Sequence, residues 1–386
     1  MSALLEGLFS GISIGSVLLI ASLGLAIVFG LMGVINLAHG ELMMLGAYTT
    51  YVIQNIFKPL GEPWFDFYII VALPAAFIVA AIAGLILEKG VIRFLYGRPL
   101  ETLLATWGVS LILRQCVRSV NWLLVISVGV FCLLFFGGRV LVSRRLDWEK
   151  IKNAVTAILL PVSTAIAALA GILMGSVPAL SKAWFSARNV DVTSPKWLSG
   201  GVKVLEFQMP YARLFIIGLT AICLLAVYLF LNQSNWGLRI RAVTQNREMS
   251  ACLGIPTAKV DALTFALGSG LAGVAGCAVS LLGSVGPNTG QNYIVDTFMV
   301  VVVGGVGNLL GSVIAAFGIG TLNYLIGSGV FAFIFSESDA FKPLVDILLF
   351  FATSSMAKVM VFALIISFLQ IKPAGLFPPK GRTAEL

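Results

Sequence analysis

The feature that most constrains this chain is a series of long apolar segments that recurs along its whole length. A helix needs about 20 apolar residues to cross the hydrocarbon core of a bilayer. Reading for such runs predicts eleven membrane spans, with a tolerance of one or two. The runs cover 9–33, 41–57, 67–87, 101–118, 122–138, 154–178, 211–231, 261–283, 294–310, 311–332 and 343–369. The chain is therefore expected to be an all-α, polytopic membrane protein of about 9–11 transmembrane helices.

Composition excludes the main soluble alternatives. Only 11% of the 386 residues are charged, 59% are hydrophobic, and the mean hydropathy is +1.01. Soluble domains carry roughly 25% charged residues, so this chain has too few charges to cover a water-exposed surface. That excludes a cytosolic enzyme, a nucleic-acid-binding domain and a disordered scaffold. The five cysteines form no C-x-x-C pair, so neither a disulfide nor a metal site is expected.

The distribution of basic residues predicts the orientation of the spans. With the N-terminus outside, the inner segments are 88–99, 139–152, 232–260 and 370–386. They hold fifteen of the 25 lysines and arginines, whereas the outer segments hold six. Basic residues accumulate on the cytoplasmic side of membrane proteins, so the C-terminus is expected to be cytoplasmic. The same bias explains the net charge of +8 without a nucleic-acid partner.

Two segments between spans have a distinct character. The outer segment 179–210 is rich in turn residues and has a strand-like pattern around 189–195. The inner segment 236–256 places Leu238, Ala242, Met249 and Leu253 at helical intervals among polar residues, before Gly254 and Pro256 stop the helix. It is predicted to be an amphipathic helix on the cytoplasmic face.

Polar side chains at predicted membrane depth are the candidate residues of a solute pathway, because such groups usually face a cavity or a partner. They are Asn36, His39, Glu41, Thr106, Ser110, Asn288, Asp296 and Asn308. The alternatives are purely structural roles. These are a connecting turn at 34–41, an outer loop at 284–293, and hydroxyls that form hydrogen bonds with their own helix backbone. The glycines at 268, 270, 273 and 276 favour close helix packing.

Several motifs of other function classes are absent. The chain has no G-x-x-x-x-G-K-[ST] phosphate loop, no H-E-x-x-H pair and only one histidine. Neither enzymatic catalysis nor direct binding of ATP is therefore expected. Few acidic residues lie within the spans, which argues against a transporter driven by an ion gradient.

The run Gly30–Glu41, which ends in Ile35-Asn36-Leu37-Ala38-His39-Gly40-Glu41, resembles the "INxAHGE" signature of the permeases of branched-chain amino acid ABC transporters. Within that family, 98–110, 195–201 and 236–312 look like the urea-transport branch. The resemblance covers about 1–120 and 185–380.

The resemblance implies a permease subunit in the bacterial inner membrane that works with a second homologous permease, two cytoplasmic ATPases and a periplasmic solute-binding protein. No cofactor is expected on this chain, since ATP would be bound by the partner subunits. A short cytoplasmic helix of such permeases docks on the ATPase, and 236–256 lies where that helix is expected. The coupling residues would be Leu238, Arg239, Arg241, Arg247, Glu248 and Leu253.

Residues 121–184 depart from the usual family pattern, and their two apolar runs predict an inserted, peripheral two-helix hairpin. The expected organisation is thus a permease part at 1–120, the hairpin at 121–184, an extracytoplasmic loop at 185–210, and a second permease part at 211–386. The predicted function is ATP-driven import of urea or a short amide. The alternatives are a branched-chain amino acid permease of the same architecture and a passive small-solute channel.

Overall fold

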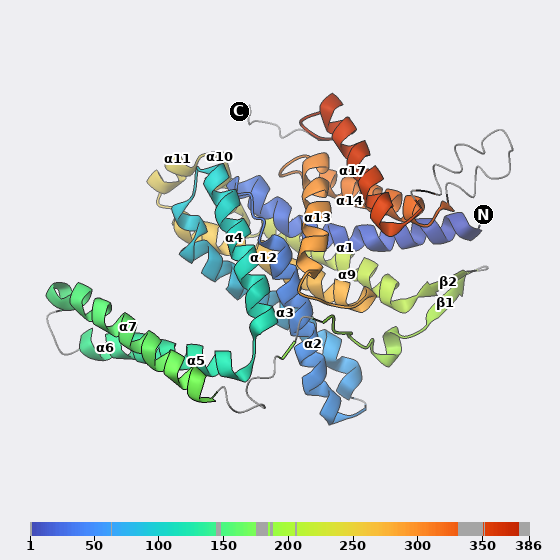
Figure 1. The fold of residues 1–386 in the computed structure, drawn as a ribbon. Coiled ribbons are helices and arrows are strands. Elements are labelled where there is room, and N and C mark those ends of the chain that lie inside the picture. Colours follow the sequence, from blue (N-terminus) through green and yellow to red (C-terminus); the bar gives the residue numbers. More distant parts are fainter. Residues whose placement is uncertain are drawn as a thin grey trace. The chain divides into compact units, whose positions relative to one another are not determined.

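The computed structural model describes residues 2–62, 64–143, 148–174, 184–185, 188–204, 207–330, 350 and 352–377. These residues are almost entirely helical, which confirms the predicted fold class (Figure 1). Two compact units are distinguished, Ile112–Asn189 and the remainder of the chain, and each is described by itself. The helices of the larger unit are α1 (Ser2–Met32), α2 (His39–Phe57), α3 (Tyr68–Gly90), α4 (Pro99–Ser119, whose end enters the smaller unit), α9 (Tyr211–Gln233), α10 (Asn235–Gln245), α11 (Arg247–Cys252), α12 (Thr257–Leu282), α13 (Thr289–Gly304), α14 (Leu309–Gly327) and α17 (Ser354–Ile371).

Seven helical segments among the described residues are long and apolar enough to cross a membrane, which confirms a polytopic protein. They are Leu5–Met32, Trp64–Phe94, Trp122–Val142, Val155–Met174, Tyr211–Gln233, Thr257–Leu282 and Leu309–Gly327. The remaining predicted spans correspond to the helices α2, α4, α13 and α17, with shifted ends. The predicted span 343–369 falls partly outside the described residues, and its helix α17 begins at Ser354.

The predicted span 294–310 is wrong at its C-terminal end. Helix α13 stops at Gly304 because Gly305 and Gly307 adopt positive φ angles of 99° and 83°, a conformation that L-residues with a side chain rarely adopt. Helix α14 then starts at Leu309, capped by the Asn308 side chain. The glycine-rich run 304–311 is thus a break between two helices rather than part of one span.

Helix α12 lies at the centre of the larger unit, and almost every residue along it is buried. It packs against α1, α2 and α3, and its glycines allow backbones to touch. A Cβ on Gly276 would lie 1.9 Å from the Met43 carbonyl oxygen of α2, and one on Gly273 would lie 2.3 Å from the Ala76 carbonyl oxygen of α3. The prediction of packing glycines in this helix is therefore confirmed.

A small β-hairpin and a loop cover one end of the larger unit. Strands β1 (Gly201–Val204) and β2 (Phe207–Pro210) pair antiparallel, and Val190 bridges to Val285. The Tyr68 hydroxyl donates to the Thr193 carbonyl oxygen at 2.8 Å. The predicted strand-like pattern in this outer segment is thus present.

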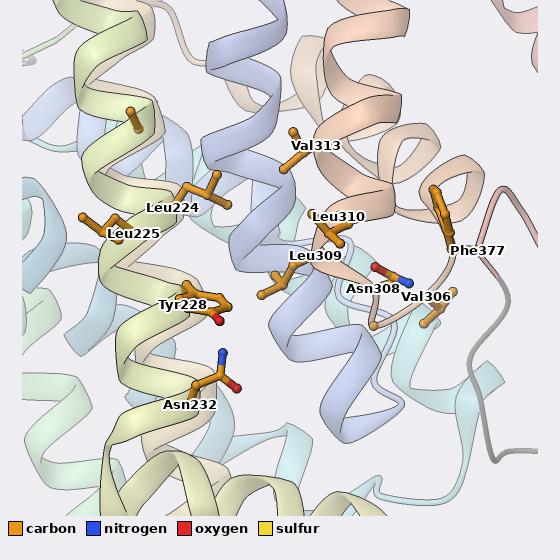
Figure 2. Close-up of a pocket in the computed structure, with 12 residues that line it drawn as sticks. Leu224, Leu225, Tyr228, Asn232, Val306, Asn308, Leu309, Leu310, Val313 and Phe377 are labelled. Atoms are coloured by element: carbon orange, nitrogen blue, oxygen red, sulfur yellow. The ribbon is translucent and has the colours of Figure 1, made fainter.

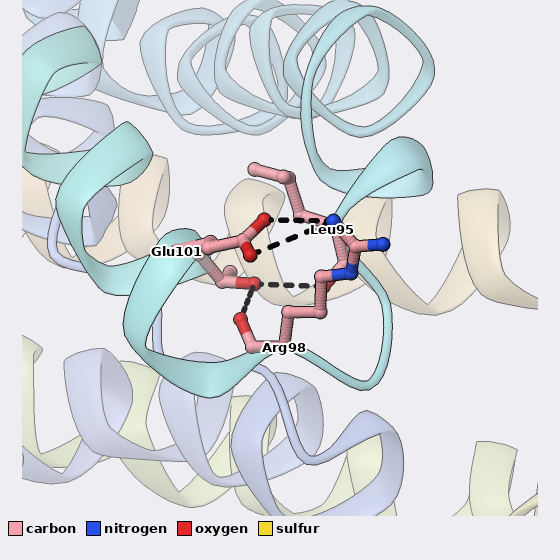
Figure 3. A network of polar contacts seen from close by, with 4 residues as sticks. Leu95, Arg98 and Glu101 are labelled. Carbon is pink, nitrogen blue, oxygen red and sulfur yellow. Dashed lines mark hydrogen bonds and ion pairs between the residues drawn. The ribbon is translucent and has the colours of Figure 1, made fainter.

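The turn that leads into α4 is held by local polar contacts (Figure 3). Pro99 is the first residue of the helix, where its missing N–H costs nothing. The Thr102 hydroxyl donates to the carbonyl oxygens of Leu95 and Arg98, and Arg98 forms an ion pair with Glu101 at 3.1 Å. These contacts fix where α4 begins.

The smaller unit contains α5 (Trp122–Cys132), α6 (Gly138–Ser143) and α7 (Trp148–Met174). Asn121 caps α5, and α5 packs against α7. The Trp184 N–H donates to the Val120 carbonyl oxygen at 2.9 Å, so the two ends of this segment meet. The unit covers the range predicted to be an inserted hairpin, and the peripheral role of that hairpin stays a prediction.

Candidate functional site

The centre of the candidate site is the break between α1 and α2. Helix α1 ends at Met32, and Gly33 turns the chain away with a φ of 66°. The Asn36 side chain is fully buried, and its Oδ1 accepts a hydrogen bond from the Ala38 N–H at 3.0 Å. Helix α2 then begins at His39. The segment 33–38 is therefore an irregular, partly buried stretch, in which Val34, Asn36 and Ala38 are buried and Gly33 is exposed. Membrane proteins tolerate irregular backbone where it lies inside protein or lines a cavity.

Helix α4 brings two of the predicted hydroxyls to this break. The Thr106 hydroxyl accepts a hydrogen bond from the Leu37 N–H at 3.2 Å, and the Ser110 hydroxyl donates to Glu41 Oε1 at 3.0 Å. Asn36, Glu41, Thr106 and Ser110 are all buried. Four candidate residues from two distant parts of the sequence thus form one buried polar cluster, which we call the break cluster.

Two buried nitrogens in this region have no hydrogen-bond partner among the described residues. They are Nδ2 of Asn36 and Nδ1 of His39, while Nε2 of His39 lies 3.0 Å from the Ala21 carbonyl oxygen. A buried polar group without a partner costs about 1–3 kcal/mol. Such groups therefore need an explanation, and a transient ligand is one.

The residues of the second predicted cluster are not brought together. Asn288 is exposed at the start of α13, whereas Asp296 is buried and forms an ion pair with Lys358 of α17 at 3.0 Å. The start of α13 does approach the start of α2. A Cβ on Gly40 would lie 2.3 Å from the Gly290 carbonyl oxygen. Asp296 thus has a structural partner that the sequence analysis did not identify.

Asn308 lies at the edge of a groove between α9 and α14 (Figure 2). Its Oδ1 accepts from the Gly311 N–H at 3.2 Å and so caps α14. The groove has a volume of about 1090 Å³ and is lined mainly by apolar side chains, with Tyr228 and Asn232 on its α9 side. The structure therefore gives Asn308 a helix-capping role at the edge of this groove.

The predicted amphipathic helix 236–256 is two helices rather than one. Asn246 leaves the helical conformation and caps α11 by accepting from the Met249 N–H at 2.9 Å, as Ser234 caps α10. Ile240 and Val243 of α10 are buried against the core, whereas Leu238, Met249 and Leu253 are 61%, 60% and 75% exposed. The two helices thus present apolar side chains that no described residue covers.

A polar network that the sequence analysis missed joins α11 to the core. Arg247 forms an ion pair with Asp261 of α12 at 2.5 Å and lies over the Tyr96 ring at 4.8 Å. The Tyr96 hydroxyl in turn donates to Glu88 of α3 at 3.4 Å. Burial raises the pKa of Tyr96 above its usual value, so this hydroxyl keeps its proton. In the sequence, the signal that could have indicated this network is Asp261, an acidic residue at the start of the apolar run 261–283.

The other predicted coupling residues lie at the surface of α10 and α11. Arg239 stacks on Trp236 of its own helix at 4.9 Å, and Arg241 donates to Asn232 at 3.2 Å. Glu248 is exposed in the first turn of α11. Arg247 is thus set apart from Arg239, Arg241 and Glu248 by its contacts with core helices.

Comparison with known proteins identifies one family. The family model described as "Branched-chain amino acid transport system / permease component" matches residues 7–140 and 193–369. The unmatched range 141–192 overlaps the predicted insertion 121–184, whereas 121–140 lies within the first match. No solved structure matches the chain.

Several curated relatives match over most of their length. The "High-affinity branched-chain amino acid transport system permease protein BraD" of Pseudomonas aeruginosa is 24% identical over 92% of this chain and 96% of its own. The Escherichia coli protein of the same description, LivH, gives the same identity and coverage. The "Probable branched-chain amino acid transport permease protein LivH" of Methanocaldococcus jannaschii is 26% identical over 84% of this chain and 80% of its own.

Proposed function

Since this chain belongs to the permease family of branched-chain amino acid ABC transporters, we propose that it is the membrane-spanning subunit of an importer for a branched-chain amino acid. The chain is a transport permease and not an enzyme. The observation that carries the proposed substrate is that relatives named for this substrate class match along 92% of the chain.

The expected urea or amide substrate is not supported by the comparisons. The resemblance to the urea branch depended on short segments, whereas the relatives that match along nearly the full length are named for branched-chain amino acids. The alternative prediction, a branched-chain amino acid permease, is therefore better supported than a urea permease.

The break cluster has groups that suit a zwitterionic solute. The N-terminus of α2 carries the positive end of a helix dipole, and Nδ2 of Asn36 is a buried donor without a described partner, so a carboxylate would be favoured there. Glu41 is a buried acceptor for an ammonium group. We assign Asn36, His39, Glu41, Thr106 and Ser110 to the solute pathway on this basis.

Partner ATPases would supply the energy through α10 and α11. The exposed side chains of Leu238 and Leu253 form an apolar contact surface for a partner. The charged residues beside this surface are Arg239, Arg241 and Glu248. In this proposal the segment faces the cytoplasm, as the distribution of basic residues predicts. A second homologous permease and a periplasmic binding protein would complete the importer.

Arg247 provides a route for movement from α11 into the membrane core. It contacts α12 through Asp261 and the turn between α3 and α4 through Tyr96. Helix α4 then contacts the Leu37 N–H and Glu41 through Thr106 and Ser110. Closure of the ATPases would thus be transmitted from α11 to the irregular segment 33–38.

Uptake of labelled solutes by cells that lack this chain tests the proposal. These cells are expected to lose leucine uptake and to keep urea uptake unchanged. Reintroducing the gene should restore leucine uptake, and vanadate should block the restored uptake. Loss of urea uptake alone would overturn the proposed substrate. Leucine uptake that continues in the presence of vanadate would indicate a passive channel.

A further inference from the structure

We propose that a pocket at the α10 end of the larger unit binds the headgroup of an anionic phospholipid. The pocket has a volume of about 390 Å³ and lies between the end of α3, the start of α10 and the first turns of α12. It is distinct from the break cluster and does not depend on the identity of the transported solute.

The charges that line this pocket favour an anion. Lys89, Arg93 and Lys259 line it, and the single carboxylate among the lining residues is Glu88. That carboxylate already accepts a hydrogen bond from Tyr96, and none of the three cations forms an ion pair with a described residue. The three cations come from α3, from the turn that follows it and from α12, so the pocket gathers positive charge from separate parts of the sequence.

The apolar part of the same pocket indicates a lipid rather than a free anion. Leu85 and Leu263 line it, and Ile82 and Ile86 on α3 are 51% and 68% exposed within a segment apolar enough to span the membrane. Acyl chains can therefore continue from the pocket along α3. Trp236 forms one wall, and tryptophan is enriched at the level of lipid headgroups. Basic pockets between membrane helices are known to hold anionic headgroups.

The test uses the full chain purified in detergent, with bound lipid counted by native mass spectrometry. Phosphatidylglycerol is titrated against the parent chain, and phosphatidylcholine and inorganic phosphate are titrated in parallel. Phosphatidylglycerol is expected to bind in preference to phosphatidylcholine, and inorganic phosphate is expected not to displace it. Replacing two cations, in the variant Arg93→Gln/Lys259→Gln, is expected to weaken its binding about tenfold or more.

The matched control is Arg98→Gln/Lys372→Gln, which removes one arginine and one lysine outside the pocket. Arg98 makes an exposed ion pair with Glu101, so its loss costs little stability. Binding within about twofold of the parent is expected for this control. Should the pocket variant not fold, the exposed Lys89→Gln replaces it, and weaker binding of phosphatidylglycerol is again expected.

Three outcomes would overturn the proposal. They are equal binding of phosphatidylcholine, displacement by inorganic phosphate at matched concentration, and an equal loss of binding in the control variant. None of these measurements depends on leucine transport, so failure of the lipid proposal and failure of the proposed function are distinguishable.

Discussion

Asn36 combines a structural and a chemical role in one side chain. Its Oδ1 accepts from the Ala38 N–H just before α2, while its Nδ2 has no described partner in a fully buried position. The hydrogen bond to Oδ1 stabilises the fold, whereas the unpaired Nδ2 donor costs free energy. The two roles can therefore be separated by a substitution that keeps the oxygen and removes the donor.

Asn36→Asp is expected to lower leucine uptake about tenfold or more, because a hydrogen bond to a charged group is worth about 1.5–3 kcal/mol. The oxygen that accepts from the Ala38 N–H remains, but a fully buried carboxylate without an ion-pair partner costs stability, so less folded chain is expected in the membrane. Uptake rates normalised to chain abundance measure the effect.

Asn121→Asp is the control, since the Asn121 Oδ1 likewise accepts a backbone N–H, in this case as the cap of α5. Uptake by this variant should equal that of the parent. A similar loss of uptake in both variants would refute a specific role for Asn36.

The pair Arg247–Asp261 leads to a prediction about stability. The Asp261 side chain is 4% exposed and Arg247 is 47% exposed, so Arg247→Ala leaves a buried carboxylate without its ion-pair partner. We expect a loss of about 1–3 kcal/mol in the free energy of unfolding. The double variant Arg247→Ala/Asp261→Asn should recover part of it, because the uncompensated charge is gone.

Thermal unfolding in detergent measures these changes. Arg98→Ala, which removes an exposed ion pair, should change the free energy of unfolding by less than about 1 kcal/mol. An equal loss of stability in Arg98→Ala and Arg247→Ala would contradict the argument that burial of the Asp261 carboxylate determines the size of the effect.

At the scale of elements, the packing of α12 decides how the other helices are arranged. Its glycines let the α2 and α3 backbones approach closely, so helices cross where a side chain would keep them apart. The arrangement buries the start of α2, His39–Glu41, together with Asn36 and Ala38 of the preceding irregular segment.

Gly276→Ala is expected to destabilise the chain by about 1–3 kcal/mol or more, since the added Cβ would lie 1.9 Å from the Met43 carbonyl oxygen. Gly218→Ala in α9 is the matched control, because no atom beyond its chain neighbours and its own helix backbone lies within 4 Å of the added methyl group. It should be neutral or stabilising by up to about 1 kcal/mol. Melting temperatures that fall equally in both variants would disprove the packing argument.

For the whole molecule, the central question is whether the smaller unit is needed for transport. The family model matches α5 in the first part of the segment and leaves 141–192 unmatched. The ends of the segment meet through the hydrogen bond between Trp184 and Val120. A segment whose ends are adjacent can be removed with little strain on the rest.

Replacing 121–183 by a short glycine-serine linker is expected to leave leucine uptake within about twofold of the parent. Removal of α10 and α11, Asn235–Cys252, should abolish uptake and serves as the contrasting control. If the first deletion stops uptake while membrane abundance stays normal, the segment is not peripheral.

The sequence was sufficient for properties that depend on contiguous residues. Hydropathy over about 20 residues is a local sum, so the helical class, the spans and the break near Asn36 could be predicted. The glycine-rich run 304–311 was misassigned to spans because apolar content does not report backbone φ.

Contacts between segments far apart in sequence were decided only by the tertiary structure. These contacts depend on how each helix is rotated and crosses its neighbours. They include the approach of Thr106 and Ser110 to the break and the ion pairs Arg247–Asp261 and Lys358–Asp296. Many crossings satisfy the same apolar pattern, because lipid and protein interior are equally apolar. Close backbone contacts at glycines select one of them, and that selection gathers the polar residues.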